Sequence, residues 1–220
     1  MRMRQLCGVG LGVALCCGAA VWAQQDTGAR QEQRAGVQPG AVVQDKLDLL
    51  QQVAFLDQTH IALGKLALER STDSGVRAFA QGLVQDHQQH LSQLQDYADA
   101  NGLELGLLSV AAEEPLGVGG SGPVGSEQSQ PAVRYSDQYI KQVNAFAVTR
   151  GELAALSGKA FDQAFLLQVS DFQKQGQKLL NTGIGRFHDD ASLALLLDRL
   201  GPLLRDHQTQ AASLVKRQGG

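Results

Sequence analysis

Residues 45–101 read DKLDLLQQVAFLDQTHIALGKLALERSTDSGVRAFAQGLVQDHQQHLSQLQDYADAN. On either side of STDSG (71–75), apolar residues recur at the three- and four-residue spacing of one helix face. The first series is Leu49, Val53, Leu56, Ile61, Leu63, Leu66 and Ala67, and the second is Val76, Phe79, Leu83, Leu91, Leu94 and Ala98. STDSG supplies a stop and a new cap, and Asn101-Gly102 is typical of a helix end. The segment therefore predicts a hairpin of two long helices, over about 45–70 and 75–101.

The second half of the chain repeats this pattern. Helical spacing resumes at Ser136-Asp137 and continues to about 156, and a further stripe follows from about 158 to NTGIG at 181–185, where we expect a break. A last helix begins at Asp189 or Asp190. Long amphipathic helices bury their stripes best against each other. The sequence thus predicts an all-α protein, an antiparallel four-helix bundle made of two long helical hairpins, with a short extra helix before the third main helix.

The N-terminus is typical of a secretory signal peptide. Arg2 and Arg4 precede an uncharged apolar stretch, and Val21-Trp22-Ala23 gives a V-x-A cleavage site, so we expect residues 1–23 to be removed. A retained membrane anchor and a lipoprotein signal are the alternatives; the stretch is short for a span, and Cys16 and Cys17 lack a small residue at the required place. Cleavage predicts an exported bacterial protein, in the periplasm or on the extracytoplasmic side of the envelope, with no transmembrane span in the mature chain.

The mature chain divides into three parts. Polar, Gly/Gln-rich residues 24–43 predict a flexible leader, and residues 44–218 predict a single helical-bundle domain interrupted by a Gly/Pro-rich linker at 111–134. Cys7, Cys16 and Cys17 all lie in the signal peptide, so the mature chain is cysteine-free and Trp-free.

Composition and motifs exclude several functions. A net charge of −3 argues against a nucleic-acid partner, which requires a basic face. There is no phosphate-binding loop, no Gly-x-Gly-x-x-Gly after a strand, no His-Glu-x-x-His and no Gly-x-Ser-x-Gly elbow. Nucleophilic catalysis has no visible carrier, so we expect a protein that is not an enzyme.

Three histidines occupy positions where the stripes predict core: His60, His87 and His207. Imidazoles and carboxylates delivered from facing helices can bind a transition metal in a bundle core, with Asp162 or Asp86 nearby. The alternative is that each histidine is a buried polar residue bonded to a neighbour. No helix carries a Glu-x-x-His pair. We expect His90 at the edge of its helix and His188 in a loop, neither with a role.

Three stretches resemble one family: LGKLALERSTDSGVRAFAQGLVQDH (63–87), LSGKAFDQAFLLQVSDFQK (156–174) and LGPLLRDHQTQA (200–211). They are similar to the exported proteins of the domain of unknown function (DUF) 4142 family, which are ferritin-like helical bundles. The resemblance implies a ferritin-like four-helix fold and export, and it implies no activity. Asp86-His87, Phe161-Asp162 and Asp206-His207 match the family pattern, which usually has Glu where this chain has His60 and His where it has Phe172.

The leading hypothesis is an exported helical-bundle protein with a non-enzymatic structural or interaction role and an envelope partner of unknown identity. The alternative is a metal-binding or redox protein whose core site uses His60, His87 and His207, with Asp162 or Asp86. The oligomeric state does not follow from the sequence.

Overall fold

A computed structural model describes residues 39–107, 110 and 135–219. The predicted signal peptide, most of the predicted leader and the predicted linker at 111–134 lie outside these residues. The described part contains five helices and no strand: α1 (Pro39–Arg70), α2 (Ser74–Ala100), α3 (Asp137–Ala154), α4 (Gly158–Arg186) and α5 (Ala191–Gly219). The all-helical class predicted from the sequence is confirmed.

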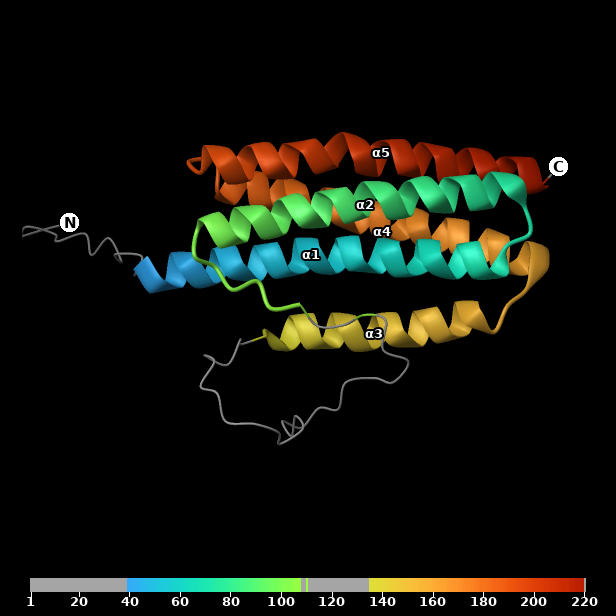
Figure 1. Cartoon of the computed structure of the whole chain (residues 1–220), viewed down its shortest axis with the longest axis horizontal. Coiled ribbons are helices and arrows are strands. Elements are labelled where there is room, and N and C mark those ends of the chain that lie inside the picture. Colours follow the sequence, from blue (N-terminus) through green and yellow to red (C-terminus); the bar gives the residue numbers. More distant parts are fainter. Residues whose placement is uncertain (1–38, 108–109, 111–134, 220) are drawn as a thin grey trace, which may run out of the picture. The chain divides into compact units, whose positions relative to one another are not determined.

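The four long helices lie side by side as two hairpins (Figure 1). α1 packs along α2 and α4 along α5, while the further contacts α1 to α4 and α2 to α5 close the group. The shorter helix α3 packs on α1 and α4. None of the helices in the described ranges is long and apolar enough to cross a membrane.

Helix boundaries follow from local capping. The Asp73 side chain accepts a hydrogen bond from the Val76 backbone N–H at 2.9 Å, and Ser136 caps α3 in the same way through Tyr139. Such caps satisfy backbone donors that have no partner within the helix. Gly102 follows α2 with a φ of 63°, a left-handed conformation that glycine adopts without strain.

Two predicted boundaries are wrong. α1 begins at Pro39 rather than near Asp45, so residues 39–43 belong to the helix and not to the leader. Proline is compatible with a first helical turn because its missing N–H would have no partner there. α4 also continues through 181–185 to Arg186. Gly183 permits close packing rather than a stop, since a Cβ there would lie 2.9 Å from Leu49 Cδ2.

Asp190 links three helices at one end of the bundle through hydrogen bonds. Its carboxylate accepts hydrogen bonds from Lys46 Nζ at 2.6 Å, from the Tyr97 hydroxyl at 2.7 Å and from the Leu193 backbone N–H at 3.0 Å. The burial of Asp190 raises its pKa, but these three bonds and the Lys46 charge outweigh burial and lower the pKa to about 2. One carboxylate therefore joins α1, α2 and the start of α5.

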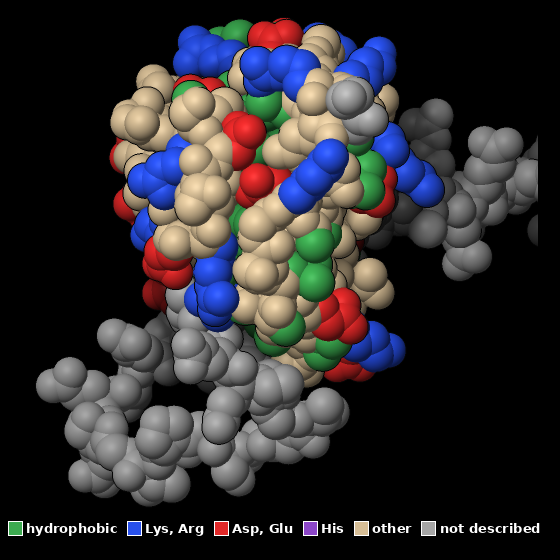
Figure 2. Space-filling view, turned by 90° about the vertical axis from the view of Figure 1, so that its right-hand side faces the viewer, with side chains coloured by type: hydrophobic (Ala, Val, Ile, Leu, Met, Phe, Trp, Pro, Cys, Tyr) green, Lys and Arg blue, Asp and Glu red, His purple; other side chains and the backbone are tan. Residues whose placement is uncertain are grey.

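The described surface mixes charges of both signs. At the end of the bundle where α1 turns into α2, Lys and Arg side chains alternate with Asp and Glu side chains (Figure 2). Inside, apolar side chains form two core clusters, and Phe172 packs against both.

Candidate functional site

The three histidines predicted on the stripes meet inside the bundle. His60 lies on α1, His87 on α2 and His207 on α5, and these residues are at most 3% exposed. The His60 and His87 rings stack with centroids 4.2 Å apart and planes at 6°, and the His87 and His207 centroids are 5.4 Å apart.

A buried carboxylate at the centre of this group, Asp57 on α1, was not predicted. Its Oδ1 accepts a hydrogen bond from His87 Nδ1 and its Oδ2 accepts one from His90 Nδ1, both at 2.7 Å. Asp57 is fully buried and His90 is 5% exposed, so the expectation that His90 lies at a helix edge is wrong. The sequence did carry a signal, because Val76, Leu83 and His90 recur every seven residues.

The contacts among Asp57, His87 and His90 shift the pKa of Asp57 and that of His90 in opposite directions. Burial raises the pKa of Asp57, but the hydrogen bonds from His87 and His90 and their positive charge outweigh burial, and the pKa is lowered. Burial lowers the pKa of His90, but its bond to Asp57, the Asp57 charge and the Leu196 carbonyl raise it overall. The geometry therefore favours an ionised Asp57 beside a readily protonated His90.

His60 is held in its neutral form. Its Nδ1–H donates to the Leu56 carbonyl oxygen at 2.7 Å, so the lone pair lies on Nε2, which is buried without a hydrogen-bond partner. Burial, and then the charge on His87, hold the pKa of His60 well below its usual range.

His207 uses both ring nitrogens. Its Nε2–H donates to Asp86 Oδ2 at 2.9 Å, and the Gln173 amide N–H faces its Nδ1 at 3.5 Å. Burial and the charge of His87 lower the pKa of His207 more than Asp86 raises it. On α4 the inward residue is thus Gln173, fully buried, whereas Phe172, at which the family pattern usually has His, lies half-buried beside it.

Asp162 and His188 lie apart from this group. Asp162 is 4% exposed and its Oδ1 has no hydrogen-bond partner, but no hydrogen bond or ion pair within the described residues joins it to a histidine. His188 lies beyond the end of α4 with a side chain 71% exposed.

The chemistry of the donor set is compatible with a metal only in part. Nε2 of His60 and of His87 is buried without a hydrogen-bond partner, while each Nδ1 is fixed by an oxygen acceptor, as in many metal-binding histidines. The parallel stack of His60 on His87 does not direct both lone pairs to one point. Within the ranges that the structure describes, no group of three His, Cys, Asp or Glu is arranged to hold an ion.

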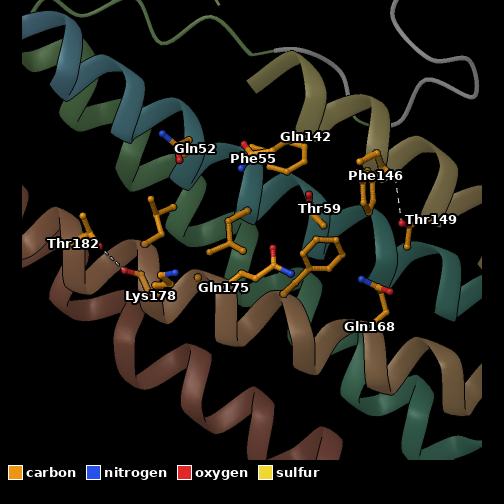
Figure 3. Close-up of a pocket in the computed structure, with 15 residues that line it drawn as sticks. Gln52, Phe55, Thr59, Gln142, Phe146, Thr149, Gln168, Gln175, Lys178 and Thr182 are labelled. Carbon is orange, nitrogen blue, oxygen red and sulfur yellow. Dashed lines mark hydrogen bonds between the residues drawn. The ribbon is translucent and has the colours of Figure 1, made fainter. Parts of the chain in front are cut away.

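A cavity of about 620 Å³ lies between α1, α3 and α4 (Figure 3). Its apolar lining includes Phe55, Leu56, Phe146, Phe172 and Leu179. The polar lining consists of Gln and Thr side chains, and Lys178 is the charged residue among the described residues that line it. Phe172 separates the cavity from the histidines, since its ring lies edge-on to His60 with centroids 6.2 Å apart.

Two polar atoms at this cavity are unsatisfied. Thr59 is fully buried, and its Oγ1 has no hydrogen-bond partner. Gln142 Oε1, on α3, also lacks a partner. Thr149 and Thr182, by contrast, donate to backbone carbonyls of their own helices. Buried polar atoms are normally hydrogen-bonded, so these two oxygens are unpaired acceptors in the wall of the cavity.

Comparison with known structures supports the fold. The chain is similar to a DUF305 protein of Streptomyces coelicolor that is provisionally described as secreted, with a TM-score of 0.57 and 12% identity. The likeness covers 79% of this chain and 93% of that one. At this identity the likeness concerns the fold alone. No curated protein matches the chain.

The family comparison covers the first hairpin. The model of the domain of unknown function DUF4142 matches residues 31–115, which include the stretch 63–87 and its Asp86-His87 pair. The stretches 156–174 and 200–211 lie outside the matched residues, so their resemblance stays a prediction. Over residues 31–115 the chain is similar to the DUF4142 family, and the family resemblance predicted from its sequence is confirmed.

Proposed function

We propose that this protein is an exported, non-enzymatic binding protein of the bacterial cell envelope, built on a ferritin-like antiparallel four-helix bundle. One observation supports this proposal above all: the cavity between α1, α3 and α4 is lined by rings, amides and hydroxyls, with one exposed lysine. Catalysis by general acid, general base or nucleophile requires titratable groups that converge on an accessible site. Asp57, His87 and His90 are buried in the core instead, and the Asp86–His207 pair, whose carboxylate is 43% exposed, lies outside the cavity lining.

Export is supported by the composition of residues 1–23 and agrees with the secreted character given to the Streptomyces coelicolor protein. Cleavage after Ala23 places the mature chain in the periplasm or on the extracytoplasmic side of the envelope, where its ligand or partner is found. The Gly/Pro-rich linker at 111–134 joins the two hairpins of a single domain at 44–218. Residues 39–43 extend the first helix of this domain at its N-terminal end.

Export is tested by expressing the full chain in a bacterium and sequencing the N-terminus of the fractionated protein. We expect Gln24 first, and no tryptophan emission, because Trp22 is the chain's single Trp. An Ala23→Arg variant, which blocks the cleavage site, serves as the control and should retain Trp emission. Trp emission from the exported wild type would contradict the proposal.

Binding is tested by native mass spectrometry of the protein purified from the envelope fraction. The expected mass is that of the mature chain plus a non-covalent small molecule. Ala145 is exposed on α3 and lines the cavity, so Ala145→Trp should fill the cavity and remove the added mass. Equal spectra for the wild type and this variant would refute a binding function for the cavity.

A second candidate is a metal-binding or redox protein, favoured by the unpartnered Nε2 atoms of His60 and His87. His60, His87 and His207 would supply imidazoles for zinc, copper or iron, with Asp86 or Asp162 nearby. Elemental analysis decides between the candidates. Metal binding would be supported if the wild type and His188→Ala carry a stoichiometric metal and the double variant His87→Ala, His207→Ala has lost it. Equal sub-stoichiometric metal in all three proteins would eliminate it.

A further inference from the structure

We propose that the cavity between α1, α3 and α4 binds a small uncharged molecule with an apolar ring body and a hydrogen-bond donor. This inference rests on the proposed binding function and specifies the class of ligand. Phenols and aromatic amines are examples of the class.

The absence of charge on the ligand follows from the lining. Around the apolar floor, the polar side chains are the amides of Gln52, Gln142, Gln168 and Gln175 and the hydroxyls of threonines. Lys178 is solvent-exposed, so its ammonium group is hydrated and does not face a buried partner. A charged ligand would lose its hydration without gaining an opposite charge, which is unfavourable.

The ring body follows from the aromatic walls. Phe55 and Phe146 meet edge-to-face with centroids 6.2 Å apart, and Phe146 and Phe172 do so at 6.0 Å. Aromatic rings favour such edge-to-face neighbours, and a further ring can continue the arrangement. The volume of about 620 Å³ lies in the range of sites for small organic molecules. A macromolecular partner would require a larger open surface.

The hydrogen-bond donor follows from the two unsatisfied oxygens. Gln142 Oε1 on α3 can only accept a hydrogen bond, and Thr59 Oγ1 on α1 can accept one as well. Both residues line the cavity from different walls (Figure 3). Both oxygens are buried in the cavity wall, so a rotation of the Gln142 or Thr59 side chain would bring one of them to a ligand N–H or O–H between the rings.

Two fluorescent probes test the class. N-phenylnaphthylamine is neutral, aromatic and carries one N–H, and anilinonaphthalenesulfonate adds a single negative charge to the same skeleton. We expect the mature wild type to bind one equivalent of the amine at least about tenfold more tightly than the sulfonate. Ala145→Trp should weaken amine binding by about tenfold or more. The matched control is Val148→Trp, on the same helix at a 56% exposed position outside the cavity, and it should bind as the wild type does.

Thr59→Val tests the polar contact separately from folding. The variant removes a buried, unpartnered hydroxyl, so its Tm should rise, while its affinity for the amine should fall by roughly two- to tenfold. A higher Tm with unchanged affinity would overturn the assigned hydrogen bond, although binding in the cavity would stand.

Other outcomes overturn the proposal. Equal binding of both probes, or equal amine binding by all variants, would refute an uncharged ligand in this cavity. A wild type that is dimeric by size-exclusion chromatography, with a monomeric Ala145→Trp variant, would identify the occupant as a second copy of the chain. If the amine fails to bind while native mass spectrometry still shows a bound small molecule that Ala145→Trp removes, the ligand class is wrong and the proposed function stands.

Discussion

Asp57 is the residue on which the polar core depends. It is fully buried and accepts hydrogen bonds from two histidines of α2, so it joins α1 to α2 through charge as well as packing. Removing one partner of a buried ionic group leaves the remaining charges buried without an opposite charge. This lowers the free energy of unfolding far more than the loss of an exposed ion pair does.

We therefore predict that Asp57→Asn lowers the free energy of unfolding by about 3–5 kcal/mol, measured by urea denaturation. The substitution keeps the shape of the side chain and removes its charge. Asp171→Asn is the matched control, because Asp171 pairs with Lys174 and its side chain is 61% exposed. That variant should lie within about 0.5 kcal/mol of the wild type. Similar losses in both variants would show that Asp57 is not ionised.

His60 should make the protein less stable in acid. Burial and the charge of His87 hold the pKa of His60 well below 6.5, so below pH 6.5 the unfolded chain takes up a proton that the folded chain does not. The resulting loss approaches about 1.4 kcal/mol per pH unit for one proton. His207 acts in the same direction, whereas His90, with a raised pKa, stabilises most below pH 6.5 and loses this effect as the pH rises.

The test compares the free energy of unfolding of the wild type and His60→Gln between pH 7 and pH 5. The wild type should lose more stability than the variant over this interval, by an amount that corresponds to one proton at most. Parallel curves would mean that His60 is charged in the folded protein and would contradict its assignment as a neutral side chain.

At this scale the sequence predicted part of the site. The stripes placed His60, His87 and His207 on inward faces because a seven-residue spacing repeats on two helical turns. They did not identify Asp57 or Gln173, since a pattern of apolar residues shows which face is buried but not how far the burial extends around it. His90 follows Val76 and Leu83 at the same spacing, so its inward position could have been predicted. Asp162 is buried as well, but sequence spacing could not show that no hydrogen bond or ion pair within the described residues joins it to a histidine.

Among the helices, α1 and α2 approach each other closely at Gly64. A Cβ at this position would lie 2.6 Å from Val84 Cγ2 and 3.0 Å from the Ala80 carbonyl oxygen. The absence of a side chain at Gly64 therefore lets α1 and α2 pack closely at this point. Gly82, on α2, has no atom within 4 Å of such a Cβ.

Two glycine substitutions should consequently have opposite effects. Gly64→Ala should lower the free energy of unfolding by about 1–3 kcal/mol, because the added methyl group forces α1 and α2 apart. Gly82→Ala should raise it by about 0.5–1 kcal/mol, since alanine loses less conformational freedom in a helix. Urea denaturation of both proteins, with helicity followed by circular dichroism, checks the pair. A stabilised Gly64→Ala variant would contradict the observed packing.

Helix existence was easier to predict than helix ends. All five helices appear where apolar spacing indicated them, because that spacing extends over many turns. The errors fall at Pro39 and Gly183, because proline and glycine often end helices, whereas here Pro39 begins α1 and Gly183 lies within α4. Proline is compatible with the first turn of a helix. Gly183 lies inside a helix because Leu49 of another helix packs against it, and a residue so distant in sequence cannot be recognised from the local pattern.

For the whole molecule, the polar layer raises the question of whether it stabilises the bundle or specifies it. Buried ionic groups can often be replaced by apolar residues of similar volume without loss of stability, although removing one partner alone is costly. Asp57, His87 and His90 form such a unit between the two apolar core clusters.

We predict that the triple variant Asp57→Leu, His87→Leu, His90→Leu is at least as stable as the wild type and clearly more stable than Asp57→Asn. Thermal and urea denaturation measure this ordering, and circular dichroism confirms that helicity is kept. A triple variant less stable than Asp57→Asn would show that the polar trio contributes net stability that leucine side chains cannot replace.

The stacked rings of His60 and His87 have a further consequence through Phe172, whose ring touches His60 on one side and the cavity on the other. Each aromatic ring generates a local magnetic field, so the imidazole protons of this pair should resonate at unusual chemical shifts. A molecule that displaces the Phe172 ring would change the field at His60. The protein thus carries its own spectroscopic sensor, and proton NMR of its histidines can follow occupancy of the cavity without any added label.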